Sequence, residues 1–460
     1  MFTLGVASGD PLPTGIVLWT RLAADPLAED GRGGMPDRVV SVEYQIAEDE
    51  KFTRIVQTGQ TSAAPELAHS VHVEVDGLNP DSEYFYRFRA GTSLSPAGRT
   101  RTAPAPGTLG ALNVCFASCA HYGHGYFTAY RRLADDHPDL VLFLGDYQYE
   151  YAAAPGDVRE VAGSETVTLA DYRRRYAQYK TDPDLRLAHA TAPWAVVWDD
   201  HEIVNDWTGN PAYRARRTAA FRAYYENMPL RASAEPSGAD MRLYRRLSWG
   251  DLVTFHLLDT RQYRDDQACG DGIKAGCAGR LDPGRTITGS EQERWLVDGF
   301  RRSSARWDLL GQQVVFCEMD RIAGPVQGYN LDAWDGYTAD RDRITAAMTG
   351  LRNAIVLTGD VHRHWAAEIR DHGQPAGVEL ITTSITSERD GDEDTAQAVL
   401  DENPHVKFYK NRRGYVRATI TPSQLRADFR ILPYVSAPGA PAATAASFVV
   451  SDRDPHLHRI

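Results

Sequence analysis

The sequence predicts a large α/β domain that follows a small antiparallel β-sandwich. Up to about residue 104, short segments of alternating apolar and polar residues are separated by turn-forming residues, which is typical of a sandwich. A stiff connector rich in Pro occupies residues 103–108. Beyond it, apolar runs alternate with segments of helical spacing. We therefore expect a sandwich over residues 1–104, an α/β domain over 105–433 and a C-terminal tail over 434–460.

The expected elements follow from these patterns. In the sandwich, strands are expected at residues 15–20, 39–46, 69–75 and 83–90. In the α/β domain, strands are expected at residues 112–117, 140–144, 194–198, 252–258, 307–316, 355–357 and 378–382, and helices at 126–135, 169–179, 212–227, 290–302 and 339–351. Ser290 and Glu293 have the spacing of a capping box.

The segment after Pro433 is rich in Ala, Pro and Gly before a charged end, so we expect it to be irregular. Two alternatives stay open for this segment, a packed lid and a loose tail.

Composition excludes two classes of protein. The chain has 460 residues, of which 42% are hydrophobic and 24% charged, and its formal net charge is -12. A nucleic-acid-binding surface needs clustered Lys and Arg, which this acidic balance argues against. No apolar stretch approaches the roughly 18 residues of a membrane span.

The five cysteines divide into three groups. Cys269 and Cys277 bracket a Gly-rich stretch and are predicted to form a disulfide, which implies an oxidising compartment and a secreted protein whose export signal has been removed. Cys115 and Cys317 lie in apolar runs and are expected to be buried free thiols. Cys119 directly follows the strand expected at residues 112–117.

Residues able to bind metal ions follow four of the expected strands. They lie in the segments Phe116–Cys119, Gly145–Tyr149, Trp198–Glu202 and Gly359–His362. Open α/β sheets place their active sites at the carboxyl ends of the strands, so we expect these segments to meet. Thiolate, phenolate, imidazole and carboxylate groups together predict a metal centre.

These segments resemble the metallophosphoesterase superfamily and, at closer range, the PhoD-like alkaline phosphatase family, to which some secreted phospholipases D also belong. The resemblance extends over nearly the whole chain and includes Ser8–Pro11, Val17–Arg21 and Leu258–Tyr263 as well as the four segments above. It implies a four-layer αββα sandwich with an N-terminal β-sandwich of fibronectin or immunoglobulin type.

The resemblance also implies two kinds of metal ion. Iron as Fe3+ is expected on Cys119, Asp146, Tyr149 and His362, and one or two Ca2+ ions on Asp146, Asp200, Asp360 and Asn205. In the wider superfamily Asp stands at the position of Cys119, Asn at Asp200 and His at Asp360. The carboxylates at Asp200 and Asp360 favour calcium over zinc, whereas thiolate and phenolate suit ferric iron and imply a coloured protein.

The expected activity is hydrolysis of phosphomonoesters, phosphodiesters or both by a metal-bound hydroxide, with His201 stabilising the phosphate or protonating the leaving group. A phospholipase D is the alternative within the enzyme class. Less favoured are a non-catalytic extracellular protein that binds phosphate or wall polymers, and the same fold loaded with zinc or manganese. We expect a monomer that contacts lipid or cell-wall polymer only transiently.

Some neighbouring residues have more than one interpretation. Asp199 competes with Asp200 as a ligand, Glu202 is expected to orient ligands, and His364 could face the site or the surface. Arg173, Arg174 and Arg175 could bind phosphate, although a solvated helix face is favoured. Tyr147 and Tyr151 are expected to pack, and Leu258–Tyr263 to support the site.

Overall fold

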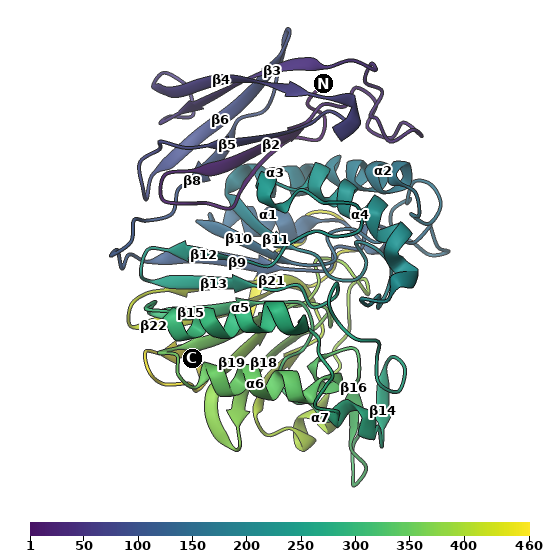
Figure 1. Cartoon of the computed structure of the whole chain (residues 1–460), viewed down its shortest axis with the longest axis vertical. Coiled ribbons are helices and arrows are strands. Elements are labelled where there is room, and N and C mark those ends of the chain that lie inside the picture. The colour runs from purple at the N-terminus through teal and green to yellow at the C-terminus, as the bar shows by residue number, and fades with distance from the viewer.

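Two β-sheets lie face to face at the centre of the molecule, and helices cover their outer faces (Figure 1). The computed structural model describes residues 1–460. The ten-stranded sheet contains, in spatial order, β24 (His458–Arg459), β23 (Ala443–Ser451), β22 (Gln424–Leu432), β21 (Arg413–Ile420), β9 (Leu112–Ala117), β10 (Leu140–Leu144), β11 (Pro193–Val197), β1 (Val6–Gly9), β2 (Ile16–Arg21) and β5 (Ser70–Val75). The seven-stranded sheet contains β12 (Arg245–Trp249), β13 (Val253–Leu257), β15 (Trp307–Gly311), β17 (Ala354–Thr358), β19 (Gln374–Ile381), β18 (His364–Asp371) and β20 (Val406–Lys410).

Helices pack on both outer faces. The larger sheet carries α1 (Thr128–Asp135), α2 (Leu169–Lys180), α3 (Pro183–Thr191) and α4 (Arg214–Asn227), and the smaller sheet carries α5 (Gly289–Arg302) and α6 (Thr338–Met348), while the short α7 (Gln397–Glu402) lies in a connection (Figure 1). The main core fills the space between the sheets, where Phe116, Leu142 and Val196 share one cluster with Phe255 and Leu309. The predicted αββα layering is confirmed.

The N-terminal region contributes to two sheets. Strands β3 (Val40–Ala47), β4 (Ile55–Ala63), β6 (Glu83–Ala90), β7 (Ser93–Leu94) and β8 (Gly98–Arg101) form a separate sheet. It packs on β1, β2 and β5 through a core of 17 buried residues. Strand β1 in turn pairs in parallel with β11, through Ser8 with Pro193 and Gly9 with Trp194. The sandwich therefore shares one of its two sheets with the rest of the chain.

An ion pair fixes this junction and explains the Ser8–Pro11 motif. Asp10 is 2% exposed, and its carboxylate accepts hydrogen bonds from Nε and Nη2 of Arg245 at 2.8 to 3.1 Å. Arg245 also donates to the carbonyl oxygens of Val196 and Leu243. The pair thus connects the turn after β1 to β11 and to the start of β12.

We expect Asp10→Ala to lower the free energy of unfolding by about 3 kcal/mol, because it leaves the largely buried Arg245 without its counter-ion. Urea unfolding followed by circular dichroism measures the change. Asp76→Ala is the control, since that carboxylate is exposed and bonds only Thr14 and a neighbouring backbone amide. Equal losses in the two variants would contradict the prediction.

Two sequence-based expectations about local structure are wrong. The C-terminal segment is not irregular, because β23 pairs with β22 from Gln424 opposite Ser451 to Ile431 opposite Ala443. The run rich in Ala and Pro before β23 and residues 452–457 lack regular structure, whereas the alternating residues of β23 bury Phe448 and Val450. Helix α5 begins one residue before Ser290, with Thr288 at the N-cap and no side-chain cap, so the capping box is absent.

The cysteine predictions are confirmed. Cys269 and Cys277 form a disulfide with an S–S distance of 2.02 Å, next to the two-stranded sheet of β14 (Ile273–Ala275) and β16 (Gly328–Asn330). Cys115 and Cys317 are buried free thiols. None of the helices has the length and apolar character needed to span a membrane.

Candidate metal centre

The ligands predicted from the sequence meet beyond the carboxyl ends of strands from both central sheets. Strands β9, β10 and β11 are parallel neighbours, so the segments after them leave the larger sheet side by side. The segment after β17 reaches the same place from the smaller sheet, and a bridge between Ser118 and Ser384 joins the two sheets there. The layering therefore brings together residues that are far apart in the sequence.

Two glycines make this approach possible. Gly145 has φ +109°, and a Cβ built on it would lie 2.4 Å from the Cβ of Asp199. A Cβ on Gly359 would lie 2.8 Å from the Cβ and Oγ of Ser118. Any larger residue would push the neighbouring segments apart, which explains why both Gly-Asp motifs begin with glycine.

The backbone at the centre is strained. Cys119, Asp146, Asp360 and His362 have φ values of 61°, 57°, 65° and 54°. This left-handed conformation is uncommon for residues other than glycine, and it costs free energy that the surrounding structure must offset. Strain of this kind clusters at functional sites, and here it is found at four predicted ligands.

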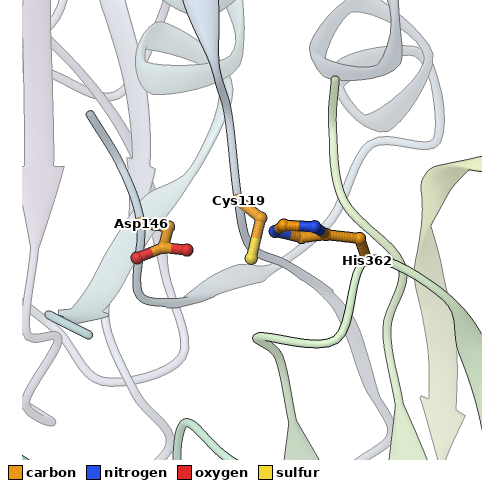
Figure 2. A group of neighbouring side chains, drawn as sticks. All are labelled: Cys119, Asp146 and His362. Carbon is orange, nitrogen blue, oxygen red and sulfur yellow. The ribbon is translucent and has the colours of Figure 1, made fainter. Parts of the chain in front are cut away.

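The first cluster joins four predicted ligands. Ligand atoms of Cys119, Asp146 and His362 lie within 4.8 Å of one another, and Figure 2 shows the carboxylate and the imidazole on opposite sides of the thiol. The Tyr149 hydroxyl donates to Asp146 Oδ2 at 2.9 Å and lies 3.1 Å from His362 Nε2. One cation could therefore contact all four side chains.

The second cluster lies beside the first and shares one carboxylate with it. Ligand atoms of Asp146, Asp200 and His201 lie within 4.8 Å of one another, and so do those of Asp199, Asp200 and Asp360. Asp146 therefore belongs to both clusters, as a bridging ligand must.

Asn205 is the one predicted ligand whose side chain is bonded away from these clusters. It is exposed, its Oδ1 accepts a hydrogen bond from the Tyr151 hydroxyl at 3.3 Å, and its Nδ2 donates to Asp206. Tyr151 is itself 42% exposed, so it lies at the rim rather than in the packed interior that was expected.

Burial makes the Cys119 thiol and the carboxyl groups of Asp146 and Asp199 hard to ionise without a cation. Despite burial, His201 and Arg261 lower the pKa of Asp200. Burial and the charge of Asp146 raise the pKa of the Cys119 thiol well above its usual value. Burial and Asp200 do the same to the pKa of Asp146, and burial raises the pKa of Asp199 to about 7. Buried oxygens of Asp199 and Asp200 have no hydrogen-bond partner. Bound cations would satisfy these oxygens and compensate the charge, so the donor set fits metal ions.

Arg261 is the main residue at the centre that sequence reasoning did not identify. It is fully buried, its Nε donates to Asp199, and its Nη1 lies 2.8 Å from Asp332 Oδ2. Its Nη2 has no hydrogen-bond partner and lies 3.9 Å from Asp200 Oδ1 and 3.8 Å from Asp360 Oδ1. The Leu258–Tyr263 motif could have revealed Arg261. It is typical of the family, and its arginine supplies a positive charge that can balance nearby carboxylates.

Arg261 also bears on the choice between Asp199 and Asp200. The guanidinium binds Oδ1 of Asp199, whereas Oδ2 of Asp200 accepts the backbone amide of Asp206 at 2.8 Å, so each carboxylate keeps one oxygen without a hydrogen-bond partner. A third acidic cluster contains Asp206, Asp271 and Asp332, but both oxygens of Asp332 are paired with Arg261, and Arg264 donates to one of them. The charge of Asp332 is therefore balanced within the protein.

Glu150 is a second residue that the sequence did not single out. Its Oε2 lies 2.7 Å from His201 Nδ1, and its Oε1 accepts the backbone amide of Asn205 at 2.9 Å. Burial alone would lower the pKa of His201, but the charges of Asp200 and Asp146 and the Glu150 hydrogen bond raise it well above its usual value. These carboxylates and Glu150 therefore favour the protonated form of His201.

Glu202 orients the backbone that carries the predicted ligands, as expected. Its carboxylate accepts the backbone amides of Asp146, Tyr147 and Asp199 at 2.7 to 3.1 Å. It thus fixes the turns after two strands at once. Tyr147 is buried as expected, and its hydroxyl lies 2.8 Å from His189 Nε2.

Predictions for two other groups are wrong. His364 is neither at the site nor at the surface, because it is fully buried and its nitrogens bond Thr383 N and Arg430 O. Arg173 and Arg175 do not lie on a solvated helix face. Arg173 is paired with the buried Glu226, and Arg175 donates to the backbone oxygen of Tyr149. Arg175 thus holds the backbone of a predicted ligand, whereas Arg173 connects α2 to α4.

Comparisons with known proteins show which family and relatives this chain is similar to. Residues 114–429 match a family model described as PhoD-like phosphatase, and residues 1–104 match the PhoD-like phosphatase N-terminal domain. The chain is 47% identical over 484 residues to alkaline phosphatase D of Bacillus subtilis, covering 100% of this chain and 82% of the relative.

Solved structures give the same result for the fold. A structure of PhoD superposes with a TM-score of 0.96 at 46% identity, covering 100% of this chain and 92% of that one. A purple acid phosphatase from yellow lupin seeds has a TM-score of 0.58 at 13% identity, covering 97% of this chain and 73% of that one, and it shares the fold alone.

Proposed function

This chain belongs to the PhoD-like phosphatase family, and on that premise we propose how its clustered side chains act. It is a phosphoester hydrolase of the alkaline phosphatase D type that works with metal ions. The observation that carries the proposal for the site is the pair of ligand clusters that share Asp146. The high identity to a phosphatase does not favour a phospholipase D or a non-catalytic binding protein.

The proposed ligand sets follow the chemistry of the donors. Cys119, Tyr149 and His362 provide thiolate, phenolate and imidazole, which suit Fe3+, with Asp146 shared. Asp200 and Asp360 provide hard oxygens, which suit Ca2+, and one or two calcium ions are proposed. Asn205 is kept as a proposed calcium ligand through a change of its side-chain rotamer. When bound, such cations neutralise phosphate charge and lower the pKa of a bound water.

His201 and Glu150 are proposed to hold and transfer the proton that the leaving group needs. His201 is held by Glu150 at Nδ1, so its Nε2 is the atom that faces Asp200, at 4.0 Å. We propose that Nε2 gives its proton to the oxygen of the leaving group as the ester bond breaks. Glu150 stabilises the protonated imidazole and fixes the orientation of its ring, much as a buried carboxylate does in other acid–base pairs.

We expect His201→Ala to lower kcat by about 10²- to 10³-fold, because general acid catalysis typically contributes that much. The effect should be smaller for a nitrophenyl ester than for an alkyl ester, since nitrophenolate leaves without a proton. Steady-state kinetics on both esters measure the difference. Wild-type turnover of the alkyl ester by the variant would refute the role of His201.

The natural ester and the cellular location are also proposals. We propose hydrolysis of monoesters, diesters or both, which turnover of a nitrophenyl monoester, a bis-nitrophenyl diester and phosphatidylcholine would separate. The Cys269–Cys277 disulfide supports a secreted protein, since disulfides persist in oxidising compartments. We further propose a monomer that makes only transient contact with lipid or wall polymer.

Elemental analysis together with a visible spectrum tests the proposed metal ions. Protein purified without added metal should contain iron and calcium and absorb visible light through the Tyr149 phenolate. Chelation should remove phosphatase activity, and calcium should restore it only while iron is retained. A colourless active enzyme loaded with zinc or manganese would overturn the iron assignment, and full activity in chelator would overturn the metal-dependent mechanism.

A further inference from the structure

One short segment of the chain contacts several of the predicted ligands of the first cluster. Residues 384–388, here called the 384–388 loop, follow β19 and run beside three predicted iron ligands. Its backbone amides at Thr386 and Ser387 both lie 3.4 Å from the carbonyl oxygen of Cys119. Glu388 Oε1 lies 3.4 Å from His362 Nδ1. The loop thus contacts the side chain or backbone of ligands from two different sheets.

Ser387 makes the contact with the remaining ligand. It is 1% exposed, and its Oγ lies 2.7 Å from the hydroxyl oxygen of Tyr149 and 2.9 Å from the carbonyl oxygen of Cys119. A serine hydroxyl has one hydrogen, so it can donate to only one of these acceptors at a time. The Cys119 carbonyl already has the two loop amides close to it, whereas the Tyr149 hydrogen is given to Asp146. The Ser387 hydrogen is therefore available to Tyr149.

The loop is held firmly in this position. Arg413 is fully buried and donates to Ser384 Oγ at 2.7 Å and to the carbonyl oxygen of Ser387. Ser384 Oγ donates to the same carbonyl oxygen at 2.8 Å. Because the backbone of Ser387 is fixed from behind, its hydroxyl is a preorganised donor rather than a mobile side chain.

We propose that Ser387 is a positioning residue of the metal centre, whose hydroxyl donates to the Tyr149 oxygen and holds that oxygen toward Asp146 and His362. The proposal rests on the proposed function, in which Tyr149 is a metal ligand. Groups that hydrogen-bond a metal ligand orient it and tune the electron density it gives to the ion, and their loss typically costs about 10- to 100-fold in metal affinity.

Three variants test the proposal in the full chain. Ser387→Ala removes the hydroxyl, Ser387→Thr keeps it, and Ser447→Ala removes a buried hydroxyl elsewhere, one that donates to Asp428 at 2.6 Å. The ion found by elemental analysis is added back to metal-free protein, and its affinity is measured by calorimetry. We expect a loss of about 10- to 100-fold for Ser387→Ala, restoration by Ser387→Thr and no change for Ser447→Ala.

Two further readouts do not depend on turnover. If the ion is iron, the visible band of Ser387→Ala should move to longer wavelength, because a phenolate without its hydrogen-bond donor gives up electron density more readily. Crystal structures of the metal-free variants should show the Tyr149 oxygen displaced in Ser387→Ala and restored in Ser387→Thr.

Wild-type affinity together with an unmoved Tyr149 oxygen in Ser387→Ala would overturn the proposal. A different ion in the wild-type protein would overturn only the iron assignment, since the affinity comparison and the structures remain valid. Should Ser387→Ala fail to fold, Ser387→Cys replaces it, because a thiol is a weak donor of similar shape.

Discussion

Replacing Asp146 with asparagine is expected to lower kcat/KM for phosphate esters by about 10³-fold or more and to remove both kinds of metal ion. Asp146 is the only residue common to the two ligand clusters, and it is 1% exposed. Asparagine keeps the shape and one acceptor oxygen, so the hydrogen bond from the His201 amide can persist. The substitution removes the negative charge of Asp146 between the two cation positions. That charge is needed to balance the positive charge of the bound cations.

Asp139→Asn is the matched control for this experiment. Asp139 is a buried carboxylate directly before β10, at the end of the strand opposite Asp146, and it bonds Arg101 at 2.6 Å. Its replacement should cost stability but leave metal content and kcat unchanged. Elemental analysis and steady-state kinetics on both variants give the comparison. Retention of iron and calcium by Asp146→Asn would show that Asp146 is not a bridging ligand.

Replacing Arg261 with glutamine is expected to lower the free energy of unfolding of the metal-free protein by about 3–5 kcal/mol. Loss of one partner of a buried ion pair leaves the other charge uncompensated, and Arg261 faces several carboxylates at once. Bound calcium should offset part of this loss, because a cation beside Asp200 and Asp360 supplies the missing positive charge. Urea unfolding in chelator and in calcium measures both effects.

Arg294→Gln serves as the control, since Arg294 is exposed on α5 and donates only to the carbonyl oxygen of Ser290. It should change stability by less than about 0.5 kcal/mol in either condition. Equal unfolding of Arg261→Gln and the wild-type protein in chelator would contradict the view that Arg261 balances the buried carboxylates. A variant insensitive to calcium would contradict the proposed location of the calcium ions.

Strand ends were the part of the fold most readily predicted from the sequence. The apolar runs that become β10, β11 and β17 are continuous because both faces of these strands are buried, and β9 differs only in its exposed Asn113. Each run ends at a Gly or a polar residue. Strands β18 to β23 were mostly missed. Their apolar residues alternate or are interrupted by charged residues such as Arg417 and Asp428, which pair with each other inside the sheet.

Polar residues with partners distant in the sequence were the least predictable part of the site. Glu150 follows a predicted ligand directly, yet only the folded chain brings it to His201. His364 has the spacing of a ligand after His362, but the start of β18 turns it into the core. Spacing along the chain cannot distinguish these two outcomes. On a regular strand His364 would share a face with His362, but the left-handed backbone at His362 interrupts the alternation.

The sequence by itself indicated an α/β class, a family resemblance that implied the αββα layering, and the candidate metal ligands with their expected division into two sites. These depend on local patterns: apolar runs, glycines before aspartates, and donor atoms after strands. Only the tertiary structure decided that Arg261, Glu150 and Ser387 accompany these donors, and that His364 is turned into the core. The physical reason is that a buried charge or hydroxyl acquires its role from its partners, and here those partners come from segments separated by tens to hundreds of residues.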